Sequence, residues 1–160
     1  MLDVGKSRIK LTTKGFEEML EAVEKAGGNV DKAARQCAEK SVVILESNLI
    51  REAQASGAET STVSHSVTAK GNIITAETGW ELGSYDSSNP SEGYKAMFVE
   101  FGTGRHSARG KGKDRETAAG HNRGSTAPRP FLAQARKKSA KQIHAIQRET
   151  LQNIVKELEK

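Results

Sequence analysis

Residues 30–57, VDKAARQCAEKSVVILESNLIREAQASG, repeat small and apolar side chains with the period of an α-helix. The repeating positions are Val30, Ala34, Cys37, Ala38, Ser41, Val42, Leu45 and Leu49. Steps of three and four residues put these side chains on one face, so the stretch predicts a long amphipathic helix. Asn29 or Asp31 can cap its beginning, and Ser56-Gly57 ends the pattern.

A shorter helix is predicted before this one, over roughly residues 14–26. Its apolar positions follow the spacing i, i+3, i+4 and i+7, namely Phe16, Met19, Leu20 and Val23. Thr12 or Thr13 can cap this helix, and Gly27-Gly28 ends it. The N-terminal part of the chain is therefore expected to be helical.

Alternation replaces the helical period after Thr62. Val63, His65 and Val67 fall on one side of an extended strand, and the stretch 73–80 is rich in β-branched residues. Gly71-Asn72 between the two stretches is a turn signal. Two antiparallel strands joined as a hairpin are therefore predicted.

The next stretch, GSYDSSNPSEG at 83–93, is dense in turn-forming residues and predicts a loop. Residues 94–101 are apolar and aromatic, but the stretch is too short for periodicity to separate a buried strand from a turn of helix. Our interpretation of 94–101 is a short helical turn that enters a strand.

The chain ends in another long helical pattern. Pro128-Arg129-Pro130 restricts the backbone just before a helix predicted from about Phe131 to Leu158. Its apolar face is made of Leu132, Ala135, Ile143, Ile146, Ile154 and Leu158. At 1.5 Å per residue this helix would be about 40 Å long, more than a compact domain of this size needs. Part of it is therefore expected to contact another subunit.

The length of 160 residues suits one domain, residues 1–160, with an α+β fold: N-terminal helices, a small antiparallel sheet and a long C-terminal helix. Leu, Ile, Val and Phe supply only 30 residues, so the hydrophobic core must be thin. A chain of this kind is expected to complete its apolar burial against neighbours, as a subunit of an assembly.

The sequence also excludes several classes of protein. No stretch approaches the roughly 18 apolar residues that span a bilayer, and the N-terminus lacks a signal-peptide core, so no membrane partner is expected. Cys37 is the only cysteine, which excludes an intramolecular disulfide and favours a cytoplasmic setting. Because Cys37 lies in an apolar helical stripe with no metal-like partner, we expect a buried structural thiol.

The positive charge is concentrated between Gly102 and Pro130, where seven bases face two acids, Asp114 and Glu116. The bases are Arg105, Arg109, Lys111, Lys113, Arg115, Arg123 and Arg129. The segment is rich in Gly, Ser and Thr and has almost no apolar residues, which predicts a long flexible basic loop over about 102–128.

No catalytic, cofactor or metal site is predicted. Gly104 and Gly110 enclose five residues, and Gly112 follows Lys111, so the loop lacks the spacing and the hydroxyl of a phosphate-binding Walker motif. The four histidines are His65, His106, His121 and His144, and none has a Cys or carboxylate at zinc-ligand spacing. No nucleophile has supporting context, so we expect a protein that is not an enzyme.

Two kinds of partner fit the basic loop equally well. A flexible segment of net charge +5 can release counterions from a nucleic-acid backbone, although it offers no aromatic side chain for base stacking. The same bases can instead pair with acidic surfaces of neighbouring subunits. The candidate DNA or partner contacts are Arg105, Arg109, Lys111, Lys113, Arg115 and Arg123.

The segment YKAMFVEFGTG at 94–104, followed after the basic loop by PRPFL at 128–132, resembles a family of tailed-phage proteins. These are the minor tail components, or tail-completion proteins, of the head-tail joining region in siphophages. The matching residues are Tyr94, Val99, Glu100, Phe101, Gly102, Thr103, Gly104, Pro130, Phe131 and Leu132. With the helices and the hairpin, the resemblance covers nearly the whole chain.

The motif also has physical explanations of its own. Gly102 and Gly104 allow backbone angles closed to other residues, so the chain can turn sharply into the loop. Phe98, Phe101 and Phe131 are expected to pack together and bring the ends of the loop close. Glu100 is expected to act through structural hydrogen bonds, with an intersubunit salt bridge as the alternative.

The resemblance implies a bacteriophage virion structural protein, assembled in the host cytoplasm. It would form a ring at the neck or tail terminus that completes the tail and joins it to the head around the DNA channel. The expected neighbours are copies of itself, as a hexamer or alternatively a dodecamer, head-closure or connector proteins and tail-tube or tail-terminator proteins. The alternative function is a nonspecific nucleic-acid-binding accessory protein that uses the basic loop.

Overall fold

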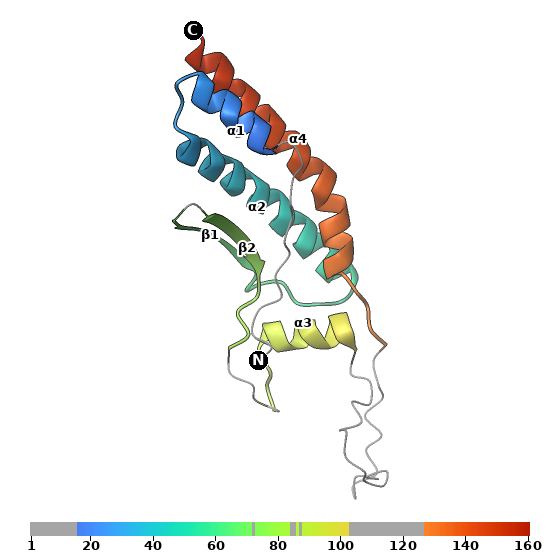
Figure 1. Cartoon of the computed structure of the whole chain (residues 1–160). Coiled ribbons are helices and arrows are strands. Elements are labelled where there is room, and N and C mark those ends of the chain that lie inside the picture. Colours follow the sequence, from blue (N-terminus) through green and yellow to red (C-terminus); the bar gives the residue numbers. More distant parts are fainter. Residues whose placement is uncertain (1–15, 72, 84–85, 87, 103–126) are drawn as a thin grey trace, which may run out of the picture.

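The computed structural model describes residues 16–71, 73–83, 86, 88–102 and 127–160. They form an α+β fold, as predicted, with four helices and one two-stranded antiparallel sheet in the described part (Figure 1). The elements in chain order are α1 (Phe16–Lys25), α2 (Val30–Ala55), β1 (Ser64–Lys70), β2 (Ile73–Gly79), α3 (Glu92–Phe101) and α4 (Leu132–Leu158).

Two long helices, α2 and α4, form the frame of the molecule. They lie side by side and run in opposite directions, with α1 packed beside the C-terminal end of α4 (Figure 1). The β1–β2 hairpin packs on α2, on the side away from α4. Helix α3 lies across the end of the pair where α2 finishes and α4 begins.

The limits of α2 follow from local chemistry. Asn29 is the N-cap, and its Oδ1 accepts a hydrogen bond from the backbone N–H of Lys32 at 2.8 Å. At the other end Gly57 has a φ of 87°, and the Ala58 N–H donates to the Ala53 carbonyl at 2.9 Å. The predicted helix and both of its boundaries are therefore confirmed.

The core is divided into two clusters at opposite ends of the α2–α4 pair. Near the N-terminus of α2, a cluster of Val23, Ala33, Cys37 and Leu151 joins α1, α2 and α4. At the other end, the junction cluster comprises Leu49, Ala53, Ala58, Ala96, Phe131 and Ala135. Since four of these six residues are alanines, the thin core expected from composition is visible in the packing.

Between the two clusters the helices also meet through polar side chains, the polar strip of Ser41, Asn48, Ser139, Gln142 and Gln147. The Asn48 amide donates from Nδ2 to Ser139 Oγ at 3.0 Å and to Gln142 Oε1 at 2.8 Å. Gln147 Nε2 donates to Ser41 Oγ at 3.1 Å. Asn48 and Ser139 are buried, so these bonds replace water that the groups have lost.

The hairpin has the predicted form. Ser64 pairs with Gly79 and Lys70 with Ile73, so the strands are joined between Lys70 and Ile73, as predicted. Strand β1 is mostly exposed, whereas Thr78 of β2 is buried and its Oγ1 donates to the Ser64 carbonyl at 3.1 Å. The hairpin is therefore anchored to α2 mainly through β2.

The prediction for 94–101 was wrong in its second half, because the whole stretch is helical and belongs to α3. Helix α3 begins at Glu92, after a proline at position 90 and with Ser91 at the N-cap. Helix α3 ends at Phe101, because Gly102 at the C-cap has a φ of 74° and turns the chain out of the helix.

The C-terminal helix was predicted correctly. Helix α4 packs against α2 and, towards its end, against α1. Most of the predicted apolar face is confirmed: Ala135 and Ile143 are buried, and Leu132, Ile146 and Ile154 are half-buried. Leu158 is the exception, because it is 43 % exposed.

Candidate functional site

The two halves of the sequence motif meet at the junction of α3 and α4. The backbone N–H of Arg129 donates to the carbonyl of Val99 at 2.8 Å, which ties the start of the second half to the end of the first. Arg129 Nη1 also donates to the carbonyl of Ser56, at 3.3 Å, at the end of α2. The ends of α2 and α3 are thus joined to the residues just before α4.

Glu100 is the central polar residue of this junction. Its Oε2 accepts hydrogen bonds from the backbone N–H groups of Phe131 at 2.7 Å and Leu132 at 3.1 Å. Phe131, the N-cap residue of α4, offers no side-chain cap of its own. A carboxylate 31 residues away in sequence therefore satisfies donors that α4 cannot satisfy itself, and its charge complements the helix dipole.

This geometry confirms the structural hydrogen-bonding role expected for Glu100. The residue is 8 % exposed, so its carboxylate has few contacts with water. A buried carboxylate is costly unless it is hydrogen-bonded, and the two backbone donors supply that compensation. The same two bonds hold the C-terminal end of α3 against the start of α4.

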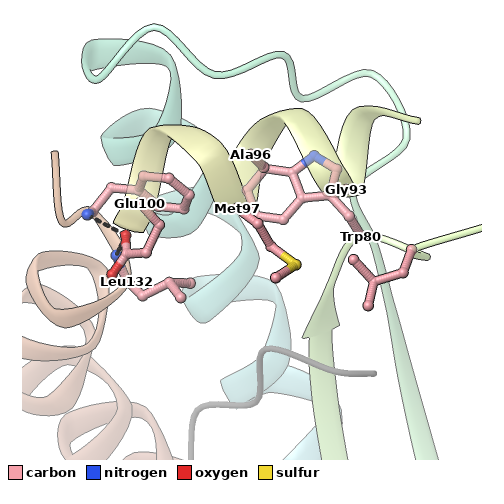
Figure 2. Close-up of a pocket in the computed structure, with 8 residues that line it drawn as sticks. Trp80, Gly93, Ala96, Met97, Glu100 and Leu132 are labelled. Atoms are coloured by element: carbon pink, nitrogen blue, oxygen red, sulfur yellow. Dashed lines mark hydrogen bonds between the residues drawn. The ribbon is translucent and has the colours of Figure 1, made fainter. Parts of the chain in front are cut away.

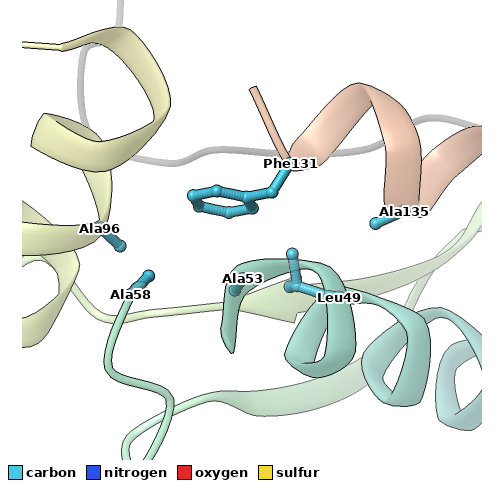
Figure 3. Close-up of a cluster of buried hydrophobic side chains, with 6 residues drawn as sticks. All are labelled: Leu49, Ala53, Ala58, Ala96, Phe131 and Ala135. Atoms are coloured by element: carbon cyan, nitrogen blue, oxygen red, sulfur yellow. The ribbon is translucent and has the colours of Figure 1, made fainter. Parts of the chain in front are cut away.

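Phe131 anchors the junction in the apolar core. Its side chain is 1 % exposed and lies between Ala96 of α3 and Leu49 and Ala53 of α2 (Figure 3). The ring of Trp80 packs against it edge-on, with centroids 5.7 Å apart and an interplanar angle of 67°. One aromatic side chain thus joins three helices and the end of the hairpin.

The predicted packing of three phenylalanines was wrong in part. Phe101 is 59 % exposed at the C-terminal end of α3, and no ring contact joins it to Phe131. Because the stretch is helical, residues 98 and 101 lie near one face while 96 and 100 lie on the buried one. Trp80, which sequence reasoning missed, occupies the position instead, and its place after the second strand was the available signal.

The start of α3 is fixed by close backbone approach and by a second carboxylate. A Cβ on Gly93 would lie 2.8 Å from the Glu81 carbonyl oxygen, so only glycine fits there without a shift. Glu92 accepts hydrogen bonds from Ser61 Oγ and from the N–H and hydroxyl of Thr62. Those bonds lower the pKa of the Glu92 carboxyl below its usual value.

A small pocket lies beside the junction (Figure 2). It is lined by Trp80, Leu82, Gly93, Ala96, Met97, Glu100, Phe131 and Leu132. Glu100 and Leu132 lie at one end and Trp80 and Gly93 at the other. Glu100 is the one ionisable side chain in this lining, and it is engaged by the α4 backbone, so the pocket is suited to an apolar contact rather than to acid–base chemistry.

The remaining motif residues lie around this junction. Tyr94 is half-buried in α3, and Val99 and Leu132 pack against the junction cluster. Gly102 is buried and adopts the positive φ that was predicted for it, whereas Pro130 is exposed. The other predicted positions lie outside the described residues: Thr103, Gly104, Arg105, Arg109, Lys111, Lys113, Arg115 and Arg123.

Neither a metal site nor a membrane span is found among the described residues. They contain no group of three or more His, Cys, Asp or Glu side chains placed to hold a metal ion. None of the helices in that part of the chain is long and apolar enough to cross a membrane. Comparisons with protein-family models, with curated proteins and with solved structures give no match.

Proposed function

We propose that this chain is a structural, non-enzymatic subunit of a tailed-phage neck or tail terminus. In this role it forms a ring that completes the tail and joins it to the head around the DNA channel. The resemblance of the two motif halves to siphophage tail-completion proteins motivates the proposal. The observation that carries it is the Glu100 contact with Phe131 and Leu132, which makes the two halves one structural unit.

The junction suits a building block more than an enzyme. Its titratable group is used to cap a helix, and its large side chains serve packing. Residues 103–126, which connect α3 to α4 in the sequence, carry six Lys or Arg side chains and can contact a neighbouring ring or the DNA path.

A ring is the expected form of an assembly of identical subunits. Identical subunits that meet head to tail close into a cyclic assembly when the rotation permits. Tail symmetry favours a hexamer, and a dodecamer is the alternative. Its neighbours in the virion would be connector or head-closure proteins on one side and tail-tube or terminator proteins on the other.

The decisive experiment is electron microscopy of lysates after disruption of the gene in the genome that carries it. The proposal predicts filled heads beside unattached or misshapen tails, and joined particles again when the wild-type chain is supplied from a plasmid. Disruption that leaves normal, infectious particles would overturn the structural role.

A second candidate function is nonspecific binding to nucleic acid. One observation favours it: residues 129–148 contain six Lys or Arg side chains and no Asp or Glu. This function predicts duplex binding that weakens steeply with salt, with a smaller slope after Arg105, Arg109, Lys111 and Lys113 are changed to Ala. The absence of duplex binding at low salt would exclude this second function.

A further inference from the structure

A stripe of basic side chains runs along the face of α4 opposite α2. Lys137, Lys141, His144 and Arg148 are all exposed. Lys137 and Lys141 are each two positions from the buried Ser139, which places them about 200° round the helix from it. The basic stripe therefore projects into solvent over about 16 Å, from residue 137 to residue 148.

Helix α1 carries a matching acidic stripe. Glu17, Glu21 and Glu24 are exposed, whereas Val23 on the opposite side is buried against α2 and α4. The helix dipole accounts for acidic residues in the first turn, which here includes Glu17. Glu21 and Glu24 lie beyond that turn, so the dipole does not explain the rest of the stripe.

Neither stripe has a partner within the residues that the structure describes. The ion pairs in that part of the chain are Arg35–Glu39, His65–Glu46, Lys95–Glu59 and Lys138–Glu52. Helix α1 packs on Leu151 and Ile154, so its acidic stripe lies beside the last third of α4, beyond most of the basic stripe.

The spacing of the two stripes is complementary. The four basic residues are separated by steps of four, three and four residues, and the three acids by steps of four and three. The steps of the basic series are the same from either end. The acids can therefore lie opposite it whether the two helices are parallel or antiparallel. Each pairing brings the three acids opposite two cationic side chains and His144 over about two helical turns.

We propose that the basic stripe of one copy binds the acidic stripe of the next copy. Each chain carries one stripe of each sign, so the contact is head to tail and continues from copy to copy until a ring closes. This inference rests on the proposed ring, because it names the surface through which its subunits meet. A duplex bound to the basic stripe would leave the acidic stripe unexplained, whereas a second copy accounts for both.

The test is self-association of the purified full chain, followed by sedimentation velocity and native mass spectrometry. The triple change Lys137→Glu, Lys141→Glu and Arg148→Glu is expected to weaken association by about tenfold to a hundredfold. The triple change Glu17→Lys, Glu21→Lys and Glu24→Lys is expected to weaken it equally. Raising salt from about 0.05 M to about 0.5 M should weaken wild-type association, since screening shortens the range of charge interactions.

Mixing the two triple variants is the most specific test of the contact. Each variant repels itself, but the reversed α4 of one is complementary to the reversed α1 of the other. Equimolar mixture should therefore restore assemblies that alternate between the two variants. Arg51→Glu on α2 and Glu81→Lys before α3 are matched controls, because both residues are exposed and lie outside the stripes, and they should associate as the wild type does.

Three outcomes overturn the inference. Reversed variants that associate like the wild type, or a mixture that stays dissociated, exclude this contact. A monomeric wild-type chain whose duplex binding is lost on reversal of the basic stripe assigns that stripe to nucleic acid. The ring function is judged separately by the lysate experiment, so a failed contact and a failed function give different results.

Discussion

Two of the regions where α4 meets the rest of the molecule use different chemistry. The junction cluster around Phe131 consists of apolar side chains, and each of its residues is at most 7 % exposed. The polar strip between α2 and α4 instead consists of Ser and amide side chains that bond one another. Apolar contacts tolerate sliding, whereas each hydrogen bond is made in one alignment only.

This difference suggests a division of roles. The junction cluster supplies most of the free energy that holds α3 and α4 to α2, because burial of large apolar side chains is the dominant stabilising term. The polar strip sets the register of the two long antiparallel helices, because its hydrogen bonds join particular residues of each. Buried polar groups with such a registering role are known from helical coiled coils.

Truncation of Phe131 should have the largest effect. Phe131→Ala is expected to lower the free energy of unfolding by about 3–5 kcal/mol, because it removes a fully buried ring and leaves a cavity between three helices. Urea denaturation followed by circular dichroism measures the loss. If this variant does not fold, Phe131→Leu should still lose about 1–1.5 kcal/mol.

Phe101→Ala is the matched control for that comparison. Phe101 is 59 % exposed, so its truncation should change the free energy of unfolding by no more than about 0.5 kcal/mol. Equal losses for the two phenylalanines would contradict the assignment of the stabilising core to the junction cluster.

Removal of the Glu100 carboxylate should have the next largest effect. Glu100→Ala leaves the N–H groups of Phe131 and Leu132 without their acceptor, for an expected loss of about 2–3 kcal/mol. Glu100→Gln keeps one oxygen acceptor and should lose about half as much. Glu81→Gln, at an exposed carboxylate, is the control and should leave the stability unchanged. If Glu100→Gln is as stable as the wild type, the negative charge is dispensable, and if Glu100→Ala is also as stable, the cap itself is dispensable.

The sequence predicted the elements well where a pattern was long. The long run from Val30 gave the right helix because eight positions repeat one face, and the Gly71-Asn72 turn located the hairpin. The stretch 94–101 was misread because a short stretch fits both periods. Its helical signal lay just upstream, where Pro90 and Ser91 precede the acidic first-turn residue Glu92.

The candidate site was predictable only in part. The role of Glu100 could be inferred, since a carboxylate between apolar neighbours needs donors, but its partners 31 residues away could not. The contact between Trp80 and Phe131 could not be predicted, because it depends on how the hairpin packs on α2. Long-range packing of this kind is set by tertiary structure and leaves no local pattern.

The polar strip should respond more weakly than the junction. Asn48→Ala is expected to lower the free energy of unfolding by about 1–2 kcal/mol, since Ser139 loses a buried partner. A double-mutant cycle with Ser139→Ala should give a coupling energy of about 0.5–1.5 kcal/mol. Ser47→Ala removes an exposed hydroxyl on the same helix and is the control, which should leave the free energy of unfolding unchanged. A coupling energy of zero between Asn48 and Ser139 would contradict the registering role of the polar strip.

The smallest effect is expected at Cys37, at the edge of the polar strip, and it depends on pH. Burial raises the pKa of the Cys37 thiol from 9.0 to about 11, with the charge of Lys40 acting weakly in the opposite direction. Between these values the folded state keeps a proton that the unfolded state has lost. The free energy of unfolding must therefore fall as pH rises through this range, and below about pH 8 the thiol contributes no slope.

Comparison with Cys37→Ala isolates this contribution. From pH 9 to pH 10 the free energy of unfolding of the wild type should fall by about 1 kcal/mol more than that of Cys37→Ala. The upper limit is about 1.36 kcal/mol per pH unit, which applies when only the folded state holds the proton. Urea denaturation of both proteins at each pH measures the difference, and all other titrating groups cancel between them. Parallel pH profiles would mean that the thiol ionises as readily in the folded protein as in the unfolded one. The cluster around Cys37 would then open locally at little cost in free energy, and the stability of the helix pair would depend mainly on the Phe131 junction.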